Sequence, residues 1–204
     1  MRIRHHVNPL KSNFFQIAVD PIKLPAGVPV EVELGSAEAH FLMTRAVEDP
    51  NRFYVGVEIR RDLVAEANAI CETQGLRQVR CVFANMSVDL PRVFPAGGVS
   101  RFFLNFPDPW FKARQQKRRV ISPELIAEMG RLLAEGGEVY VATDIFDIAL
   151  DAMAALEGDI APLFTNLREP WTFLRRSPFA ARSWREKQCE TEAIPIWRLG
   201  YRKR

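Results

Sequence analysis

Short apolar runs alternate along this chain with longer segments in which apolar residues recur every three or four positions. Runs of the first kind, bounded by turn-forming residues, are typical of buried strands, and segments of the second kind are typical of amphipathic helices. The predicted strands cover residues 30–35, 53–59, 79–84, 101–104, 138–143 and 194–201. The predicted helices cover residues 38–48, 62–73, 122–134 and a segment that ends near residue 156.

The helix predicted over residues 122–134 carries the clearest boundary signals. Ser122 suits the N-cap, Pro123 suits the first helical position, and acids follow in the first turn. Gly136 and Gly137 are expected to end this helix. Because strands alternate with helices, the pattern predicts a doubly wound, mostly parallel sheet of the Rossmann-like α/β class.

Length and composition favour one domain over residues 1–204, since a chain of this length buries about 70% of its unfolded surface. Cys71, Cys81 and Cys189 are too few and too scattered for a disulfide framework or a metal cluster, which is typical of a reducing cytoplasm. No apolar run approaches a membrane span, and His5 and His6 have no third ligand at metal spacing. We therefore expect a cytoplasmic protein without metal or membrane segment, in an oligomeric state that the sequence leaves open.

Positive charge is concentrated in two segments, although the net charge is only +3. Residues 101–120 hold six cations and one acid, and residues 168–204 hold ten cations and four acids. If these segments fold together they form one basic patch, as expected of a protein that binds a phosphate backbone. Two unrelated solvated surfaces are the alternative.

One carboxylate, Asp108, stands between two prolines directly after the apolar run at 101–104. Open α/β sheets bind ligands at the carboxyl ends of their strands, where this acid could accept hydrogen bonds from the N–H groups of a ligand. Trp110 could stack on a planar ring, and Lys112 with the cations up to Arg119 could neutralise phosphates. The motif indicates a nucleobase on a nucleic-acid backbone; an ordinary turn followed by a solvated helix face is the alternative.

The loop after the first predicted strand is suited to a cofactor without phosphates. Gly35 follows this strand, and Glu58 ends the second strand, where an acid grips ribose hydroxyls in such folds. The loop at 35–39 has one glycine where a dinucleotide site has three, and it carries an acid where a pyrophosphate would lie. Flanked by Glu33 and Glu38, it suits the sulfonium and ammonium groups of S-adenosylmethionine better than NAD.

Three segments resemble the bacterial tRNA (guanine-N7)-methyltransferase family. Residues 4–10 are similar to its amino-terminal segment, and residues 142–144 to its Ala-Thr-Asp after the fifth strand. Residues 106–112, with the basic run 117–119, resemble its most diagnostic motif. The resemblance implies S-adenosylmethionine-dependent methylation of guanosine N7 in the variable loop of tRNA.

The resemblance also implies roles for individual residues. The cofactor positions are Glu33, Gly35, Glu58, Asn85 and Asp108, with Asp108 also the catalytic aspartate. The positions that contact substrate are Lys112, Asp144, Ser183 and Glu186, with Glu190 or Glu192 as alternatives to the last acid. The basic segments at about 1–12 and 168–204 are expected to contact RNA.

The loop departs from the family, which reads Gly-x-Gly-x-Gly where this chain has Ala37 and Ala39 at the second and third glycines. If these positions need positive φ, alanine weakens cofactor binding. One alternative is therefore a catalytically silent RNA-binding protein on a methyltransferase scaffold. Another interprets residues 105–108 as a divergent motif for methylating exocyclic amines.

Overall fold

The computed structural model describes residues 19, 21–108, 121–158 and 163–204. Its strands are β1 (Val30–Leu34), β2 (Phe53–Glu58), β3 (Val79–Phe83), β4 (Val99–Asn105), β5 (Leu133–Thr143), β6 (Phe164–Asn166) and β7 (Trp197–Lys203). Its helices are α1 (His40–Glu48), α2 (Arg61–Thr73), α3 (Leu90–Val93), α4 (Pro123–Leu132), α5 (Phe146–Glu157) and α6 (Trp184–Thr191).

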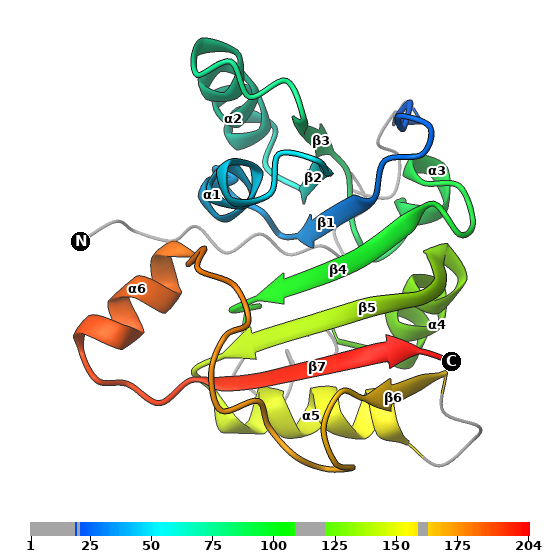
Figure 1. Cartoon of the computed structure of the whole chain (residues 1–204), viewed down its shortest axis with the longest axis vertical. Coiled ribbons are helices and arrows are strands. Elements are labelled where there is room, and N and C mark those ends of the chain that lie inside the picture. The colour runs from blue at the N-terminus through cyan, green and yellow to red at the C-terminus, as the bar shows by residue number, and fades with distance from the viewer. Residues whose placement is uncertain (1–18, 20, 109–120, 159–162) are drawn as a thin grey trace.

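The described strands form one seven-stranded sheet in the order β3-β2-β1-β4-β5-β7-β6 (Figure 1). The pairs from β3 through β5 are parallel, whereas β7 runs antiparallel to both β5 and β6. The carboxyl ends of the parallel strands therefore meet at one edge of the sheet. Figure 1 shows β4 and β5 ending on the side from which α6 projects.

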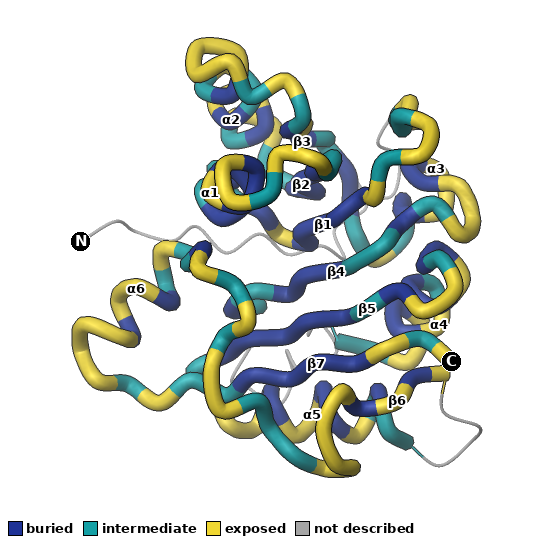
Figure 2. The backbone as a smooth tube through the Cα atoms, in the orientation of Figure 1, coloured by how far each residue is buried: buried dark blue, intermediate teal, exposed yellow. Residues whose placement is uncertain are grey.

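The sheet is buried on both faces, as parallel sheets require (Figure 2). One apolar cluster joins strand side chains such as Val32 and Phe102 to residues of α3, α4 and α5. The other joins Tyr54 and Phe103 to residues of α1, α2 and α6. Together these clusters confirm the layered α/β architecture predicted from the alternation of strands and helices.

The expected elements are present, but some boundaries differ. Ser122 caps α4 by accepting a hydrogen bond from the Leu125 amide at 3.3 Å, as predicted. The prediction that Gly136 and Gly137 end this helix is wrong, because α4 ends at Leu132 and both glycines lie within β5. Leu133 is fully buried and pairs with Val99 of β4, so sheet pairing extends the strand backwards.

The segment after α5 holds most of what the sequence pattern missed. The short strand β6 and the helix α6 were not predicted, nor was the one-turn helix α3. The closing strand was expected at 194–201 and spans Trp197–Lys203. Since α6 is mostly polar, with Glu186 and Cys189 as its buried residues, it has no apolar stripe that sequence periodicity would reveal.

Candidate functional site at the carboxyl edge of the sheet

Apart from Ser183 and Glu186 at the start of α6, the predicted site residues within the described ranges lie at or after the carboxyl ends of five strands. Glu33 is the residue before the last of β1, and Glu58 is the last residue of β2. Asn85 follows β3, Asp108 follows β4, and Asp144 directly follows β5. Because these ends share one edge, the sheet collects side chains that are far apart in the sequence. Lys112 and Trp110 lie outside the described residues.

The innermost pair of this edge is Glu33 and Asn105, on the neighbouring strands β1 and β4. The Asn105 Nδ2 atom donates to Glu33 Oε1 at 2.8 Å. The other oxygens, Glu33 Oε2 and Asn105 Oδ1, are buried and have no hydrogen-bond partner among the described residues. Burial raises the pKa of Glu33 to about 8; the Asn105 hydrogen bond opposes this rise and the charge of Glu58 adds to it. A buried pair with two spare acceptors fits a ligand that brings donors, such as an ammonium group.

The loop between β1 and α1 is a tight, left-handed turn. Gly35 has φ 78°, and two residues without glycine's freedom, Ala37 at 48° and Ala39 at 57°, are also in the left-handed region. The amides of Gly35 and Ser36 both donate to the Val57 carbonyl, which fixes the loop to β2. This geometry starts α1 at His40 rather than at residue 38.

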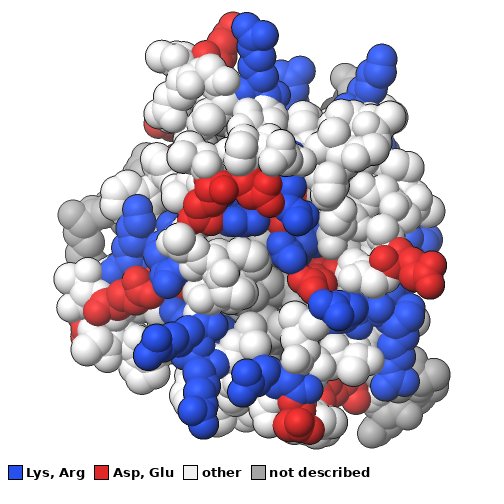
Figure 3. Space-filling model, viewed as in Figure 1, with Lys and Arg blue, Asp and Glu red and all other residues white. Residues whose placement is uncertain are grey.

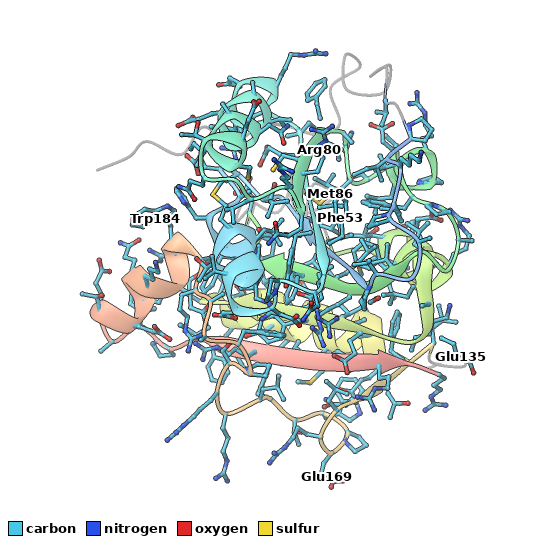
Figure 4. All side chains as sticks on the ribbon, turned by 45° about the horizontal axis from the view of Figure 1, so that its top comes forward. Phe53, Arg80, Met86, Glu135, Glu169 and Trp184 are labelled. Carbon is cyan, nitrogen blue, oxygen red and sulfur yellow. The ribbon has the colours of Figure 1, made fainter. Side chains whose placement is uncertain are left out.

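The positive φ of Gly35 disfavours other residues there, while its nearest neighbour is in ordinary van der Waals contact. A Cβ atom there would lie 3.4 Å from the methyl carbon of Met86, a residue of the loop after β3 that is labelled in Figure 4. The loops after β1 and β3 therefore approach each other across the edge.

Glu58 is buried and accepts hydrogen bonds from three main-chain amides and one arginine. The amides are those of Ala37, Ile59 and Arg60, at 2.9–3.0 Å. Its partner side chain is Arg60, whose Nε and Nη2 atoms each donate at 2.9 Å. Glu58 therefore holds the left-handed loop in place as well as standing where a ribose acid is expected.

Arg60 is a site residue that the sequence analysis missed. Hydrogen bonds to Glu58 raise its pKa; partial burial opposes this rise, and the charges of Glu58, Asp108 and Glu38 add to it. Arg60 thus links the acid at the end of β2 with the acid after β4. The sequence did contain a sign of this role, because Arg60 stands two residues after Glu58 and a buried acid needs a cation to pair with.

Asn85 is buried and ordered by its own loop. Its amide N–H donates to Asp89 at 2.8 Å, and its Oδ1 atom accepts from the Ser87 amide at 3.0 Å. This turn orients the carboxamide at the end of β3.

The chain leaves β4 through a strained residue. Phe106 has φ 51° and is buried, and its amide donates to the Ala142 carbonyl of β5 at 2.7 Å. A phenylalanine with positive φ is held only by the surrounding structure, and such outliers are concentrated at functional sites. This turn directs the following residues, including half-buried Asp108, to the sheet edge.

Asp144 connects the edge to α6. The Arg185 Nε atom donates to Asp144 at 3.1 Å. Ser183 caps α6 by accepting from the Glu186 amide at 3.2 Å, and the buried Glu186 carboxylate pairs with Arg198 of β7 at 2.8 Å. Ser183 and Glu186 thus have structural partners, and their contact with substrate stays a prediction.

Basic side chains gather beside this edge. Figure 3 shows Lys and Arg over the loop that leads to α6 and over α6 itself, with acids between them. Arg175 and Arg176 are exposed in that loop, whereas Arg182 is paired with Glu190 at 2.8 Å. Most of the other basic segment, 101–120, lies outside the described residues, so the predicted joint patch is not tested.

Two kinds of feature are absent from the described part of the chain. No cluster of three metal-ligating side chains is found in it. None of its helices has the length and apolarity needed to cross a membrane.

Known proteins resemble this chain in sequence over nearly its whole length. Residues 28–199 match the model of a family described as "Putative methyltransferase". The tRNA (guanine-N(7)-)-methyltransferase of Synechococcus sp. (strain JA-3-3Ab) is 36% identical over 208 residues, which cover 100% of this chain and 86% of that protein. The enzyme of the same name from Synechocystis sp. (strain ATCC 27184 / PCC 6803 / Kazusa) is 33% identical, with coverage of 97% and 95%.

Solved structures show the same fold at low sequence identity. The aminoglycoside resistance methyltransferase NpmB1 superposes with a TM-score of 0.59 at 16% identity, covering 86% of this chain and 87% of that one. Geranyl diphosphate C-methyltransferase from Streptomyces coelicolor A3(2), solved with Mg2+, geranyl diphosphate and S-adenosyl-L-homocysteine, gives a TM-score of 0.58 at 14% identity, covering 87% of this chain and 76% of that one. The architecture is that of Rossmann-like methyltransferases.

Proposed function

This chain belongs to the tRNA (guanine-N7)-methyltransferase family, and from that premise we propose that it transfers a methyl group from S-adenosylmethionine to guanosine N7 in the variable loop of tRNA. One observation carries the proposal. The polar residues that the family resemblance assigns to the cofactor lie at or after the ends of β1 to β4: Glu33, Glu58, Asn85 and Asp108. The acid on β1 also pairs with Asn105, and each of the two side chains keeps one buried oxygen without a described hydrogen-bond partner.

The residues of the edge fit the cofactor chemically. Glu33 and Asn105 offer acceptors for its ammonium group, because two of their oxygens are buried without a described partner. Glu58 would bind the ribose hydroxyls in competition with the Arg60 side chain, which donates to both of its oxygens. Asn85, whose amide carries donors and an acceptor, suits the adenine edge.

The transfer needs positioning rather than proton removal. S-adenosylmethionine supplies a methyl group on positively charged sulfur. Guanine N7 carries a lone pair and no hydrogen, so no general base is required. Transfer of the methyl group from sulfur to N7 would leave a neutral thioether and positive charge on the purine. Asp108 would accept hydrogen bonds from the N1 and N2 hydrogens, which orients the base and stabilises that charge.

The substrate side of the site would be formed by Lys112, Asp144, Ser183 and Glu186, with RNA held by the basic region at 168–204. Arg185 supports this arrangement because its ion pair with Asp144 fixes the start of α6 against the end of β5. A guanosine stacked inside folded tRNA has to be turned out to reach a site at a sheet edge.

The test is to incubate the protein with methyl-labelled S-adenosylmethionine and unmodified tRNA, and to map the labelled nucleotide. We expect 7-methylguanosine in the variable loop. Label on an exocyclic amine, on protein or nowhere would overturn the proposal.

A second candidate, a silent RNA-binding protein, is favoured by Ala37 and Ala39. Both hold the left-handed conformation that costs L-residues about 1–2 kcal/mol. Calorimetry with S-adenosylmethionine separates the candidates, since absence of binding would favour the silent protein.

A further inference from the structure

A pocket of about 300 Å³ lies between α1 and α6, beside the candidate site and not within it. It is lined by His40, Met43, Thr44, Val47, Gln74, Arg182, Trp184 and Lys187. No acid is among these lining residues. Three of them, Arg182, Trp184 and Lys187, belong to the basic segment 168–204. The pocket size is at the lower end of the range for small-molecule sites.

The dominant side chain of the pocket is Trp184, the first residue of α6. It is 59% exposed, and its backbone lies in the first turn of α6, which Ser183 caps. Figure 4 shows it at the end of α6 nearest α1. The His40 ring meets it edge-on, with 5.3 Å between centroids, and Lys187 Nζ lies 5.6 Å from the indole centroid. An exposed indole offers a large flat surface on which a planar ring can stack.

The charge around the indole is positive. Arg182 is tied to Glu190, whereas Lys187 forms no ion pair with any described carboxylate. Val47, 72% exposed, adds an apolar contact on the α1 side. Aromatic surfaces flanked by cations are the usual means of holding unpaired bases, because the ring stacks on the base and the cation meets its phosphate.

The pocket adjoins residues that flank the candidate site. His40 directly follows the left-handed loop at the end of β1, and Arg185, next to Trp184, pairs with Asp144 at the end of β5. We propose that this pocket binds a second unstacked nucleobase of the tRNA, close to the methylated guanosine, with Trp184 as its stacking surface and Lys187 at its phosphate. The inference rests on the proposed function, because it takes tRNA as the substrate.

The experiment compares Trp184→Ala and Trp184→Phe with wild type by filter binding of unmodified tRNA. Loss of a base stack weakens binding about 10-fold or more in Trp184→Ala, and Trp184→Phe retains most of the affinity. Lys187→Gln lowers the log-log salt slope by about one. Leu150→Ala is the control for loss of an exposed apolar side chain, since Leu150 is 43% exposed on α5, lines no part of the pocket and lies outside both basic segments. Calorimetry with S-adenosylmethionine checks that each variant still folds and binds cofactor.

The inference is overturned if Trp184→Ala binds tRNA as tightly as wild type, or if Leu150→Ala loses as much affinity as Trp184→Ala. If methylation then proceeds normally, the proposed function stands without the pocket. If the wild-type protein methylates no tRNA, the proposed function fails separately, and a selective loss in Trp184→Ala still supports an RNA-binding pocket. Capture of a protein ligand by the pocket with no effect on RNA would also contradict it.

Discussion

Replacing Glu33 by glutamine tests the buried Glu33–Asn105 pair at the carboxyl edge of the sheet. In the folded protein the pKa of Glu33 is about 8 instead of the ordinary 4.5, first because of burial. Below pH 4.5 both folded and unfolded states hold the proton. Between pH 4.5 and pH 8 only the folded state holds the proton, so the free energy of unfolding falls as pH rises through this window. Above pH 8 the carboxylate is charged in both states, and the folded protein keeps the full free-energy penalty of burying that charge. At about 1.4 kcal/mol per pH unit, the penalty is on the order of 5 kcal/mol.

Glu33→Gln keeps the shape and the acceptor for Asn105 but has no charge to bury. We expect it to match wild-type stability at about pH 5 and to exceed it by a few kcal/mol at about pH 9, measured by urea unfolding without cofactor. Glu135→Gln, which replaces an exposed acid labelled in Figure 4, is the control. It should leave the free energy of unfolding nearly unchanged at both pH values. If the Glu33→Gln protein is less stable than wild type at the higher pH, the reasoning is refuted, because the carboxylate would then be stabilised in the fold.

The same proton links Glu33 to cofactor binding. A cationic ammonium favours the ionised acid, so the proton should leave as the cofactor arrives. Wild-type affinity for S-adenosylmethionine is expected to rise from about pH 6 to about pH 8, with proton release seen by calorimetry in two buffers of different ionisation enthalpy. Glu33→Gln should lose both the pH dependence and much of the affinity.

Three further substitutions examine the rest of the edge. Asp108→Asn should lower the single-turnover methylation rate by about 100-fold while cofactor affinity measured by calorimetry changes little; near-normal turnover would remove its catalytic assignment. Arg60→Met should tighten S-adenosylmethionine binding about 3- to 10-fold, because Glu58 gives up two hydrogen bonds that compete with ribose; weaker binding would mean that Arg60 itself holds the ligand. Ala37→Gly should raise the free energy of unfolding by about 1 kcal/mol by relieving a positive φ, and an unchanged urea midpoint would show that the loop is unstrained.

The sequence alone located the acids that end strands. Apolar runs mark strands, so Glu58 and Asp108 were expected at strand ends from the pattern, whereas Asn85 and Asp144 were assigned by the family resemblance. This works because a buried parallel strand must be apolar throughout, which makes its ends visible. The resemblance of residues 106–112 to a known motif then gave the family, which the comparisons confirmed.

Only the tertiary structure decided which of these groups meet. Glu33 and Asn105 are 72 positions apart and pair because β1 and β4 are neighbours, an order that no local pattern encodes. Ala37 and Ala39 adopt the left-handed conformation because hydrogen bonds to Val57 anchor their loop to β2. The strand β5 begins at Leu133 because this residue pairs with Val99 of β4. Local sequence determines where backbone hydrogen bonds and burial favour a strand or a helix. The pairing of side chains across strands, and of Trp184 with His40, depends on long-range packing that exists only in the folded chain.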